Sequence, residues 1–316
     1  MTEFRNAVVM GTGMMGPGIA AVLALGGLRV TLLSRTLDRA EAGVAEAHAT
    51  LAFLRRHGLI DYPEQACEAS EAITPGADMA GAVGKADLVI ESLPENLALK
   101  QQLFRDLDLA APPHAALCSN TSGLSITPIA SQCDRHSERV LTTHFWNPPH
   151  LMPLVDVVCA ERTSVPLAQS VIDLLRHCNK TPVLVRKDRP GQLGNRLHQA
   201  VVREAANIVA EGIATAEDVD LAARRGFGFR LPAYGILEHQ DLVGLELCSG
   251  VVGYVAQDLY NEPQAPPIYA EKLAEGHTGA AAGNGFYDWT QGKSAADVKA
   301  RRDAFLVYLL QQERRT

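Results

Sequence analysis

The chain has 316 residues, of which 47% are hydrophobic and 21% are charged, and its net charge is -7 at pH 7. This composition predicts a soluble globular protein long enough for two domains, and the negative charge argues against a nucleic-acid or anionic-membrane partner. The six cysteines are scattered and form no C-x-x-C pair, which favours a reducing cytoplasm and predicts neither a disulfide framework nor a metal site.

The N-terminus runs from Met1 to Asn6 directly into an apolar stretch, which leaves no room for a signal peptide. No apolar run approaches the roughly 18 residues that a membrane span needs. We therefore expect a cytoplasmic protein.

Short β-rich runs then alternate with amphipathic helical stretches, a pattern typical of a parallel, doubly wound α/β sheet. The predicted strands are 6–10, 28–34, 87–92, 115–119, 138–144, 154–159 and 182–187. The predicted helices are 16–26, 36–57, 95–109 and 166–177. The last three strands have short connections, so part of the sheet could be antiparallel.

A charged turn with proline and glycine at 188–191 separates this pattern from a helical one. Apolar residues then recur at helical spacing, and the predicted helices are 193–211, 216–225, 247–260 and 294–312. We therefore predict an α/β domain over residues 1–188 and an all-α domain over residues 189–316. The glycine- and alanine-rich segment 276–285 is expected to be a flexible loop.

The segment GTGMMG at 11–16 follows the first predicted strand and opens the first helix. In that position G-x-G-x-x-G binds a dinucleotide: its glycines permit a tight turn, close approach of the pyrophosphate, and packing of helix on strand. We therefore predict a Rossmann-like domain. The residues expected to bind its cofactor are Gly11, Gly13, Met14, Met15 and Gly16.

The end of the second strand decides which nicotinamide dinucleotide fits. An aspartate or glutamate there would bind the adenosine ribose hydroxyls of NAD, whereas this chain has Ser34 and Arg35. A hydroxyl and a guanidinium suit a 2′-phosphate, so the sequence favours NADP. In the alternative, Arg35 lies over the adenine and the cofactor is NAD.

Polar residues also follow the next two strands, at the edge where parallel sheets bind ligands. Glu95 and Lys100 open the helix after 87–92, where they could line a ligand or form an exposed first turn. Ser119-Asn120-Thr121-Ser122 ends the strand 115–119. These residues could cap the following helix or hydrogen-bond substrate and nicotinamide.

The segment from His144 to Asp156 is the most informative one for chemistry. His144 ends a strand on the ligand side of the sheet, and Asp156 lies in the apolar run MPLVDVV. A buried carboxylate is costly unless it is paired, and a His–carboxylate pair orients a general base. We therefore predict an acid/base pair, with Asn147 beside it. Asn195, on the first helix of the second domain, could be structural or could contact substrate.

Together these motifs resemble those of the L-3-hydroxyacyl-CoA dehydrogenase family, and the match runs nearly end to end. The family's motifs correspond to the glycine segment, E-N-L-x-x-K at 95–100, S-N-T-S at 119–122, H-F-x-N-P with a following carboxylate at 144–156, N-R-L at 195–197 and G-x-G-F-Y at 283–287. The resemblance implies a Rossmann domain followed by a helical domain that forms a homodimer, and an enzyme of the kind used in fatty-acid metabolism.

The resemblance also implies the role of each site residue. His144 would take the hydroxyl proton while the nicotinamide accepts a hydride, and Asp156 would orient and stabilise its imidazole. The substrate oxygen would be positioned by Ser122, Asn147 and Asn195. The region of the nicotinamide ribose would be lined by Glu95, Lys100 and Ser122.

Three positions depart from the family's pattern. The carboxylate partner is Asp156 where a glutamate is usual, which shortens its reach by about 1.5 Å. Ser34 and Arg35 stand where the ribose-binding acid is expected. Ala281 and Ala282 lie where a lysine commonly precedes the late G-x-G-F-Y.

The blocks at 147–158 and 226–238 are similar to the L-gulonate dehydrogenase (λ-crystallin) branch, whose members oxidise free hydroxy acids. Three functions therefore remain open. The first is an NAD(P)-dependent dehydrogenase of an L-3-hydroxyacyl substrate, as a CoA thioester. The second is the same reaction on a free 3-hydroxy acid such as a sugar acid or a carnitine-like molecule. The third is a non-catalytic nucleotide-binding or structural protein.

Overall fold

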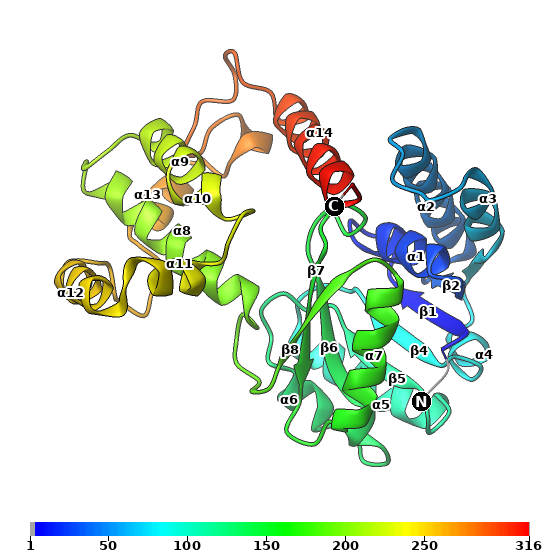
Figure 1. Ribbon diagram of the computed structural model, residues 1–316. Helices are drawn as coiled ribbons and strands as arrows, with labels where there is room; N and C mark the ends of the chain where they lie inside the picture. The colour runs from blue at the N-terminus through cyan, green and yellow to red at the C-terminus, as the bar shows by residue number, and fades with distance from the viewer. Residues whose placement is uncertain (1–3, 316) are drawn as a thin grey trace. The chain divides into compact units, whose positions relative to one another are not determined.

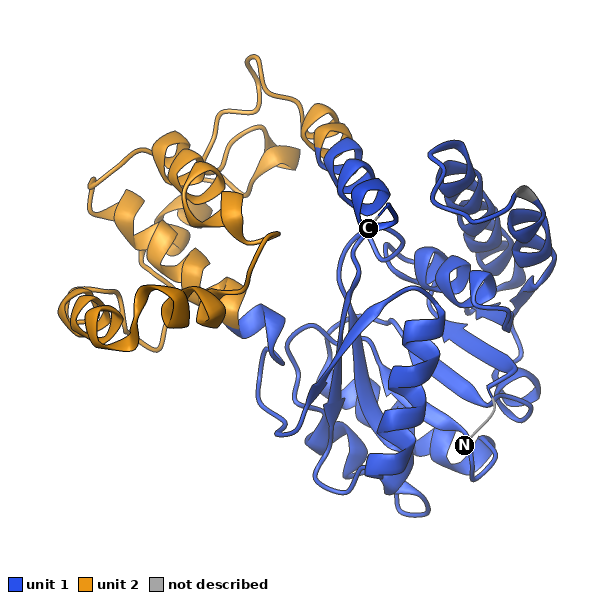
Figure 2. Cartoon of the chain, in the orientation of Figure 1, with its two compact units in different colours: residues 1–196, 302–316 blue, residues 197–301 orange. Residues whose placement is uncertain are grey.

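The computed structural model describes residues 4–315, and these form two compact units (Figure 2). Unit 1 contains the chain up to Arg196 and again from Arg302, and unit 2 contains Leu197–Arg301. Residues 189–196 therefore lie in the first unit, and the chain returns to that unit at its C-terminal end. The domain division predicted between residues 188 and 189 stays a prediction.

Unit 1 is built on an eight-stranded sheet in the order β3-β2-β1-β4-β5-β6-β7-β8. Neighbouring strands are parallel except for β6 and β7, which are antiparallel. The predicted doubly wound α/β sheet is confirmed, and its antiparallel part is this one pair. The strands are β1 (Asn6–Met10), β2 (Arg29–Leu33), β3 (Ile73–Gly76), β4 (Leu88–Glu91), β5 (Ala116–Ser119), β6 (Val140–Phe145), β7 (Leu154–Cys159) and β8 (Thr181–Val185).

Strand β3 is the one that the sequence pattern did not predict. Its sequence, ITPG, contains a proline and a glycine, residues that typically interrupt strands. β3 lies at the edge of the sheet and pairs with β2 alone. A proline is tolerated there because an edge strand need not donate every N–H group to a neighbour.

Helices cover both faces of this sheet (Figure 1). Because strand side chains alternate between faces, Ala7 and Val9 of β1 join one core and Val8 and Met10 join the other. The first core includes residues of α1 (Gly16–Leu25), α2 (Leu37–Arg56), α3 (Pro63–Glu71) and α7 (Val165–His177). The second includes residues of α4 (Met79–Val83), α5 (Leu97–Ala110) and α6 (Ile126–Ala130).

Helices dominate the described part of unit 2, as predicted, and its β pairing consists of isolated bridges at Gly279, Asn284 and Asp288. The segment 276–285 contains the short 3-10 helix η2 (Ala280–Ala282). In residues 4–315, none of the helices is long and apolar enough to cross a membrane. The remaining helices are η1 (Ser137–Arg139), α8 (Gly194–Ala210), α9 (Ala216–Arg225), α10 (Phe227–Arg230), α11 (Ile236–Val243), α12 (Leu245–Val255), α13 (Ile268–Ala274) and α14 (Ala295–Glu313).

Helix α14 begins in unit 2 and ends in unit 1. In unit 1 its Val307 packs with Leu54, Leu59 and Leu151 in a small separate core. Arg314, just after the helix, forms an ion pair with Asp61 at 3.1 Å. The second half of α14 and Arg314 are therefore part of the structure of unit 1.

The polar ends of the strands meet at one edge of the sheet. Met10 pairs with Glu91, Glu91 with Ser119, and Ser119 with Thr142, so β1, β4, β5 and β6 are aligned there. Between their ends β1, β4 and β5 are apolar, as is usual for parallel strands that are covered on both faces. This carboxyl-terminal edge brings the residues of the candidate site together.

Candidate functional site

The loop between β1 and α1 carries the glycine motif, and two of its positions require glycine. Gly11 has a φ of 107°, and a Cβ atom there would lie 2.5 Å from the carbonyl oxygen of Ser92. A Cβ atom on Gly16 would lie 1.8 Å from the carbonyl oxygen of Gly11. These close approaches hold α1 against the ends of β1 and β4.

The other positions of this loop fit a dinucleotide. A Cβ atom on Gly13 would meet nothing within 4 Å, so this backbone is open to a ligand. Met14 is 78% exposed beside it, whereas Met15 packs against the first core. α1 has neither a side-chain cap nor an acidic residue in its first turn, so its N–H groups are available to an anion.

Ser34 and Arg35 follow β2 at the same edge of the sheet. The N–H of Ser34 donates to the carbonyl oxygen of Gly76 at 3.0 Å, and its side chain is half-buried. Arg35 is exposed, and its guanidinium has no partner among residues 4–315. Both side chains are therefore available to a ligand that reaches the end of β2.

Strands β6 and β7 place His144 and Asp156 directly opposite each other. Nδ1 of His144 lies 3.0 Å from Oδ2 of Asp156, and both side chains are buried. Asp156 also accepts hydrogen bonds from Nε1 of Trp146 and from the N–H of Gly194, each at 3.3 Å. A carboxylate held in this way can keep the imidazole proton on Nδ1, which leaves Nε2 as a base.

Asn120 ties the turn after β5 to the strand that carries the histidine. Its Oδ1 accepts a hydrogen bond from the N–H of Phe145 at 2.8 Å. Its Nδ2 donates to Oγ of Ser92 at 3.2 Å. The S-N-T-S segment is therefore fixed against both β6 and the loop after β4.

Two further asparagines predicted for the site also lie in unit 1. Asn147 donates from Nδ2 to Sδ of Met14 at 3.2 Å, so the turn after β6 adjoins the glycine loop. Asn195 donates from Nδ2 to the carbonyl oxygen of Ser122 at 2.8 Å. The structure thus brings Asn195 to Ser122 and Asn147 to the glycine loop.

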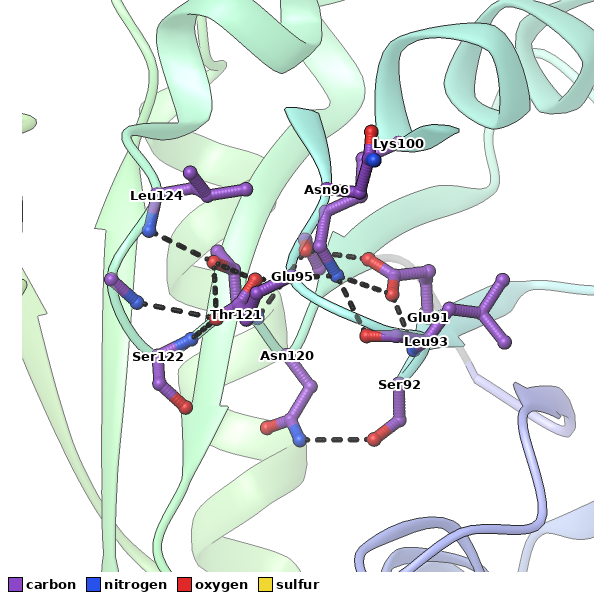
Figure 3. A network of polar contacts seen from close by, with 12 residues as sticks. Glu91, Ser92, Leu93, Glu95, Asn96, Lys100, Asn120, Thr121, Ser122 and Leu124 are labelled. Atoms are coloured by element: carbon purple, nitrogen blue, oxygen red, sulfur yellow. Dashed lines mark hydrogen bonds and ion pairs between the residues drawn. The ribbon is translucent and has the colours of Figure 1, made fainter. Parts of the chain in front are cut away.

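Glu95 holds the turn after β5 (Figure 3). Its carboxylate accepts hydrogen bonds from the hydroxyl of Thr121 at 2.9 Å and from the N–H groups of Ser122 and Gly123. Nζ of Lys100 lies 3.7 Å from Oε2 of Glu95. Since Lys100 is 1% exposed, the alternative of an exposed first turn is wrong for it.

The sequence pattern also placed the start of this helix too early. α5 begins at Leu97, after Asn96, whose side chain accepts a hydrogen bond from the N–H of Leu99 at 3.0 Å. Glu95 therefore lies in the loop before the helix, and only Lys100 lies on the helix itself.

Two carboxylates that the sequence pattern did not single out also act here. Glu91 ends β4 with no exposed surface, and its Oε1 lies 2.6 Å from Nζ of Lys100. Asp188 accepts hydrogen bonds from the N–H groups of Ile126 and Thr127 at the start of α6. A signal for Glu91 was present, because a charge that ends an apolar strand needs a partner.

Neither a metal centre nor a reactive thiol is formed by the described residues at this edge. Among residues 4–315, histidine, cysteine, aspartate and glutamate side chains form no group of three or more that could hold a metal ion. Burial raises the pKa of the Cys118 thiol, next to Ser119, to about 12. This thiol therefore stays protonated and is a poor nucleophile at neutral pH.

Two family models match consecutive parts of the chain. The 3-hydroxyacyl-CoA dehydrogenase NAD binding domain matches residues 6–189, and the 3-hydroxyacyl-CoA dehydrogenase C-terminal domain matches residues 191–289.

Individual proteins are similar over almost the whole chain. The 5-formyl-3-hydroxy-2-methylpyridine 4-carboxylate 5-dehydrogenase of Mesorhizobium japonicum is 32% identical over 96% of both chains. The mitochondrial hydroxyacyl-coenzyme A dehydrogenase of Sus scrofa is 34% identical over 90% of this chain and 91% of its own. A crystal structure of a pyridine-carboxylate dehydrogenase of the first kind, described as an NAD+ dependent dismutase, has a TM-score of 0.87 and 30% identity and covers 99% of this chain and 98% of its own.

Proposed function

Since the chain belongs to the 3-hydroxyacyl-CoA dehydrogenase family, and is an oxidoreductase of that kind with a nicotinamide cofactor, we propose that it interconverts an L-3-hydroxyacyl substrate, as a CoA thioester, and its 3-oxo form. The observation that carries this proposal is the buried His144–Asp156 pair, 3.0 Å apart, at the sheet edge next to the glycine loop. Oxidation of an alcohol requires a group that takes the hydroxyl proton. His144 can supply that group.

A bound nicotinamide would supply the hydride acceptor. Asp156 keeps the Nδ1 proton on His144 and so leaves the lone pair of Nε2 free to accept the substrate's hydroxyl proton. When Nε2 takes that proton, the imidazole becomes cationic and the carboxylate of Asp156 stabilises the charge. In the opposite direction the same nitrogen returns the proton to the carbonyl oxygen.

Three polar side chains are proposed to hold the substrate oxygen: Ser122, Asn147 and Asn195. The hydrogen bond from Asn195 to the carbonyl of Ser122, at 2.8 Å, supports a common place for these two residues. The contact of Asn147 with Met14, at 3.2 Å, supports a place beside the cofactor's loop. Polar groups fixed in this way can orient a substrate before reaction.

The cofactor is proposed to lie along the carboxyl-terminal edge of the sheet. Its pyrophosphate would be held by Gly11, Gly13, Met14, Met15 and Gly16, and its nicotinamide ribose would lie near Glu95, Lys100 and Ser122. NADP is favoured because the guanidinium of Arg35 is exposed and has no partner within the described residues, and because no carboxylate ends β2. NAD remains the alternative, and the description of a similar solved enzyme as NAD+ dependent supports it.

A free hydroxy acid is the second candidate substrate. The similarity to a pyridine-carboxylate dehydrogenase, with a TM-score of 0.87, favours a small carboxylate without coenzyme A. The proposed chemistry at His144 is the same for both substrates.

A homodimer is proposed to form through unit 2. Large apolar side chains are exposed along α11 and α12, among them Leu237, Leu242, Val251, Val252 and Tyr254. Such a concentration of exposed apolar surface is typical of a protein–protein interface. A cytoplasmic location and a place in fatty-acid metabolism stay predictions.

Reduction of acetoacetyl-CoA, measured side by side with NADPH and NADH, tests the proposed reaction. We expect turnover with acetoacetyl-CoA and a higher kcat/KM with NADPH. Turnover only with free 3-oxo acids would replace the first substrate by the second. An absence of turnover with both substrate classes, in a protein that binds the cofactor, would overturn the proposal.

A further inference from the structure

Glu91 is a buried carboxylate with three hydrogen-bond partners at the edge of the sheet (Figure 3). Its Oε1 accepts from Nζ of Lys100 at 2.6 Å and from the N–H of Leu93 at 2.5 Å. Its Oε2 accepts from the hydroxyl of Ser119 at 2.7 Å. Glu91 has no exposed surface and Lys100 is 1% exposed, so this is a fully desolvated ion pair.

Lys100 connects this ion pair to the turn that contains Ser122. Its ammonium donates to the carbonyl oxygen of Leu93 at 3.2 Å and lies 3.7 Å from Oε2 of Glu95. Glu95 in turn accepts hydrogen bonds from the N–H groups of Ser122 and Gly123. The buried ammonium of Lys100 thus holds the carboxylates of Glu91 and Glu95, and Glu95 holds the turn that contains Ser122.

The same network adjoins the glycine loop. The carbonyl oxygen of Ser92, next to Glu91, is the atom that a Cβ on Gly11 would meet at 2.5 Å. The N–H of Ser92 donates to the carbonyl oxygen of Met10 at 2.8 Å. A shift of the backbone at 92–93 would therefore move the wall against which Gly11 packs.

We propose that Glu91 is a positioning residue for the dehydrogenase reaction. Through Lys100 it fixes Glu95 and the turn of Ser122, and through Leu93 it fixes the wall of the glycine loop. In this role Lys100 affects ligand binding through Glu95 and does not itself contact the ribose. This inference rests on the proposed function, since it assumes that Ser122 and the glycine loop bind substrate and cofactor.

Glu91→Gln tests this role because it keeps the shape of the side chain and removes its charge. The buried ammonium of Lys100 then has only Glu95 as a counter-charge and should draw Glu95 away from Ser122 and Gly123. We expect the dissociation constant of NAD(P)H to rise about tenfold, within the range for coupled contacting residues. We expect kcat to fall about 100-fold, the cost of a misplacement of about 1 Å.

Lys100→Met and the double variant Glu91→Gln/Lys100→Met separate positioning from stability. Each single variant removes one partner of the buried Glu91–Lys100 ion pair and should lower the unfolding temperature, whereas the double variant removes both charges and should recover most of it. Cofactor affinity and kcat should be impaired in all three variants, and no more in the double variant than in the worse single variant, because the two residues act through one path. If Glu91→Gln does not fold, cofactor affinity and kcat can still be measured in the double variant.

Asp108→Asn is the matched control. Asp108 forms an equally buried ion pair with Arg139, at 3.0 Å, next to the amino-terminal end of β6 and so at the opposite edge of the sheet. The Asp108→Asn substitution should lower the unfolding temperature and leave cofactor affinity and kcat unchanged.

Two results would overturn the inference. One is a folded Glu91→Gln protein with the cofactor affinity and kcat of the unmodified protein. The other is a double variant whose defects are the product of the two single defects, since the residues would then act independently. The cofactor titration needs no substrate, so it decides the role of Glu91 even if the proposed substrates are not turned over.

Discussion

Oδ2 of Asp156 lies 3.0 Å from Nδ1 of His144, although this carboxylate is one methylene shorter than the glutamate usual in the family. The two residues face each other across the antiparallel β6–β7 pair. Directly opposed residues in such a pair have Cα atoms about 4.5–5.5 Å apart and side chains on the same face. The strand pairing therefore brings the two side chains within contact distance without the extra methylene of a glutamate.

Asp156→Asn should lower kcat by about 10³- to 10⁴-fold, as when a histidine loses the carboxylate that fixes its tautomer. The amide can donate to Nδ1 and so place the proton on Nε2, the wrong nitrogen for a base. Cofactor affinity should not change, because the hydrogen bonds of the Asp156 carboxylate within residues 4–315 join it to His144, Trp146 and Gly194. Steady-state kinetics and a cofactor titration check this, and a kcat within a few-fold of the unmodified enzyme would contradict it.

His144→Ala should abolish turnover and leave cofactor binding intact, because the histidine acts on the substrate's proton. His177→Ala is the matched control, since His177 is exposed at the end of α7. The control should keep full activity. An active His144→Ala protein would rule out His144 as the base.

The sequence predicted much of this arrangement because its signals are local. Parallel strands are apolar runs, the glycine loop has a fixed spacing after β1, and a carboxylate such as Asp156 in an apolar run demands a partner. Strand β3 was not predicted because its four residues, ITPG, resemble a turn. The return of α14 to unit 1 depends on contacts between distant segments, such as that of Val307 with Leu54, and no short-range pattern encodes it.

Gly13→Ala should weaken cofactor binding without loss of stability, whereas Gly16→Ala should lower stability. The methyl group added at position 13 would meet nothing within 4 Å, so the protein should unfold at the same temperature but bind NAD(P)H more weakly. The methyl group added at position 16 would lie 1.8 Å from the carbonyl oxygen of Gly11, so this variant should be destabilised. Thermal unfolding and cofactor titration check both, and unchanged affinity in Gly13→Ala would place the pyrophosphate elsewhere.

Arg35→Ala should weaken the binding of NADPH by about 10- to 100-fold, the loss of a charge-assisted hydrogen bond to phosphate. NADH binding should change much less, because NADH lacks the 2′-phosphate. Arg39→Ala, also exposed and one turn along α2, is the control and should affect both cofactors slightly. Equal losses for NADPH and NADH in Arg35→Ala would show that Arg35 does not bind the phosphate.

Lys180 should make stability depend on pH above neutrality. It donates hydrogen bonds to the carbonyl oxygens of Pro149 and Met152, and burial lowers its pKa from 10.5 to about 8. Between these values the unfolded chain keeps a proton that the folded chain has lost, so stability rises with pH across this window. Between pH 8 and 10.5 the free energy of unfolding of the unmodified protein should rise by about 3 kcal/mol relative to that of Lys180→Met. Denaturant unfolding checks this, and a constant difference would contradict it.

The route of the backbone makes unit 2 an insertion tethered at both ends. The polypeptide leaves unit 1 after Arg196 and re-enters it at Arg302. A single proteolytic cut between these points would leave both halves joined to unit 1, one of them through Val307, which packs with Leu54, Leu59 and Leu151. Leu151 lies four residues after Asn147. A protein shortened at residue 289, where the C-terminal family match ends, would lose this packing beside a turn of the candidate site.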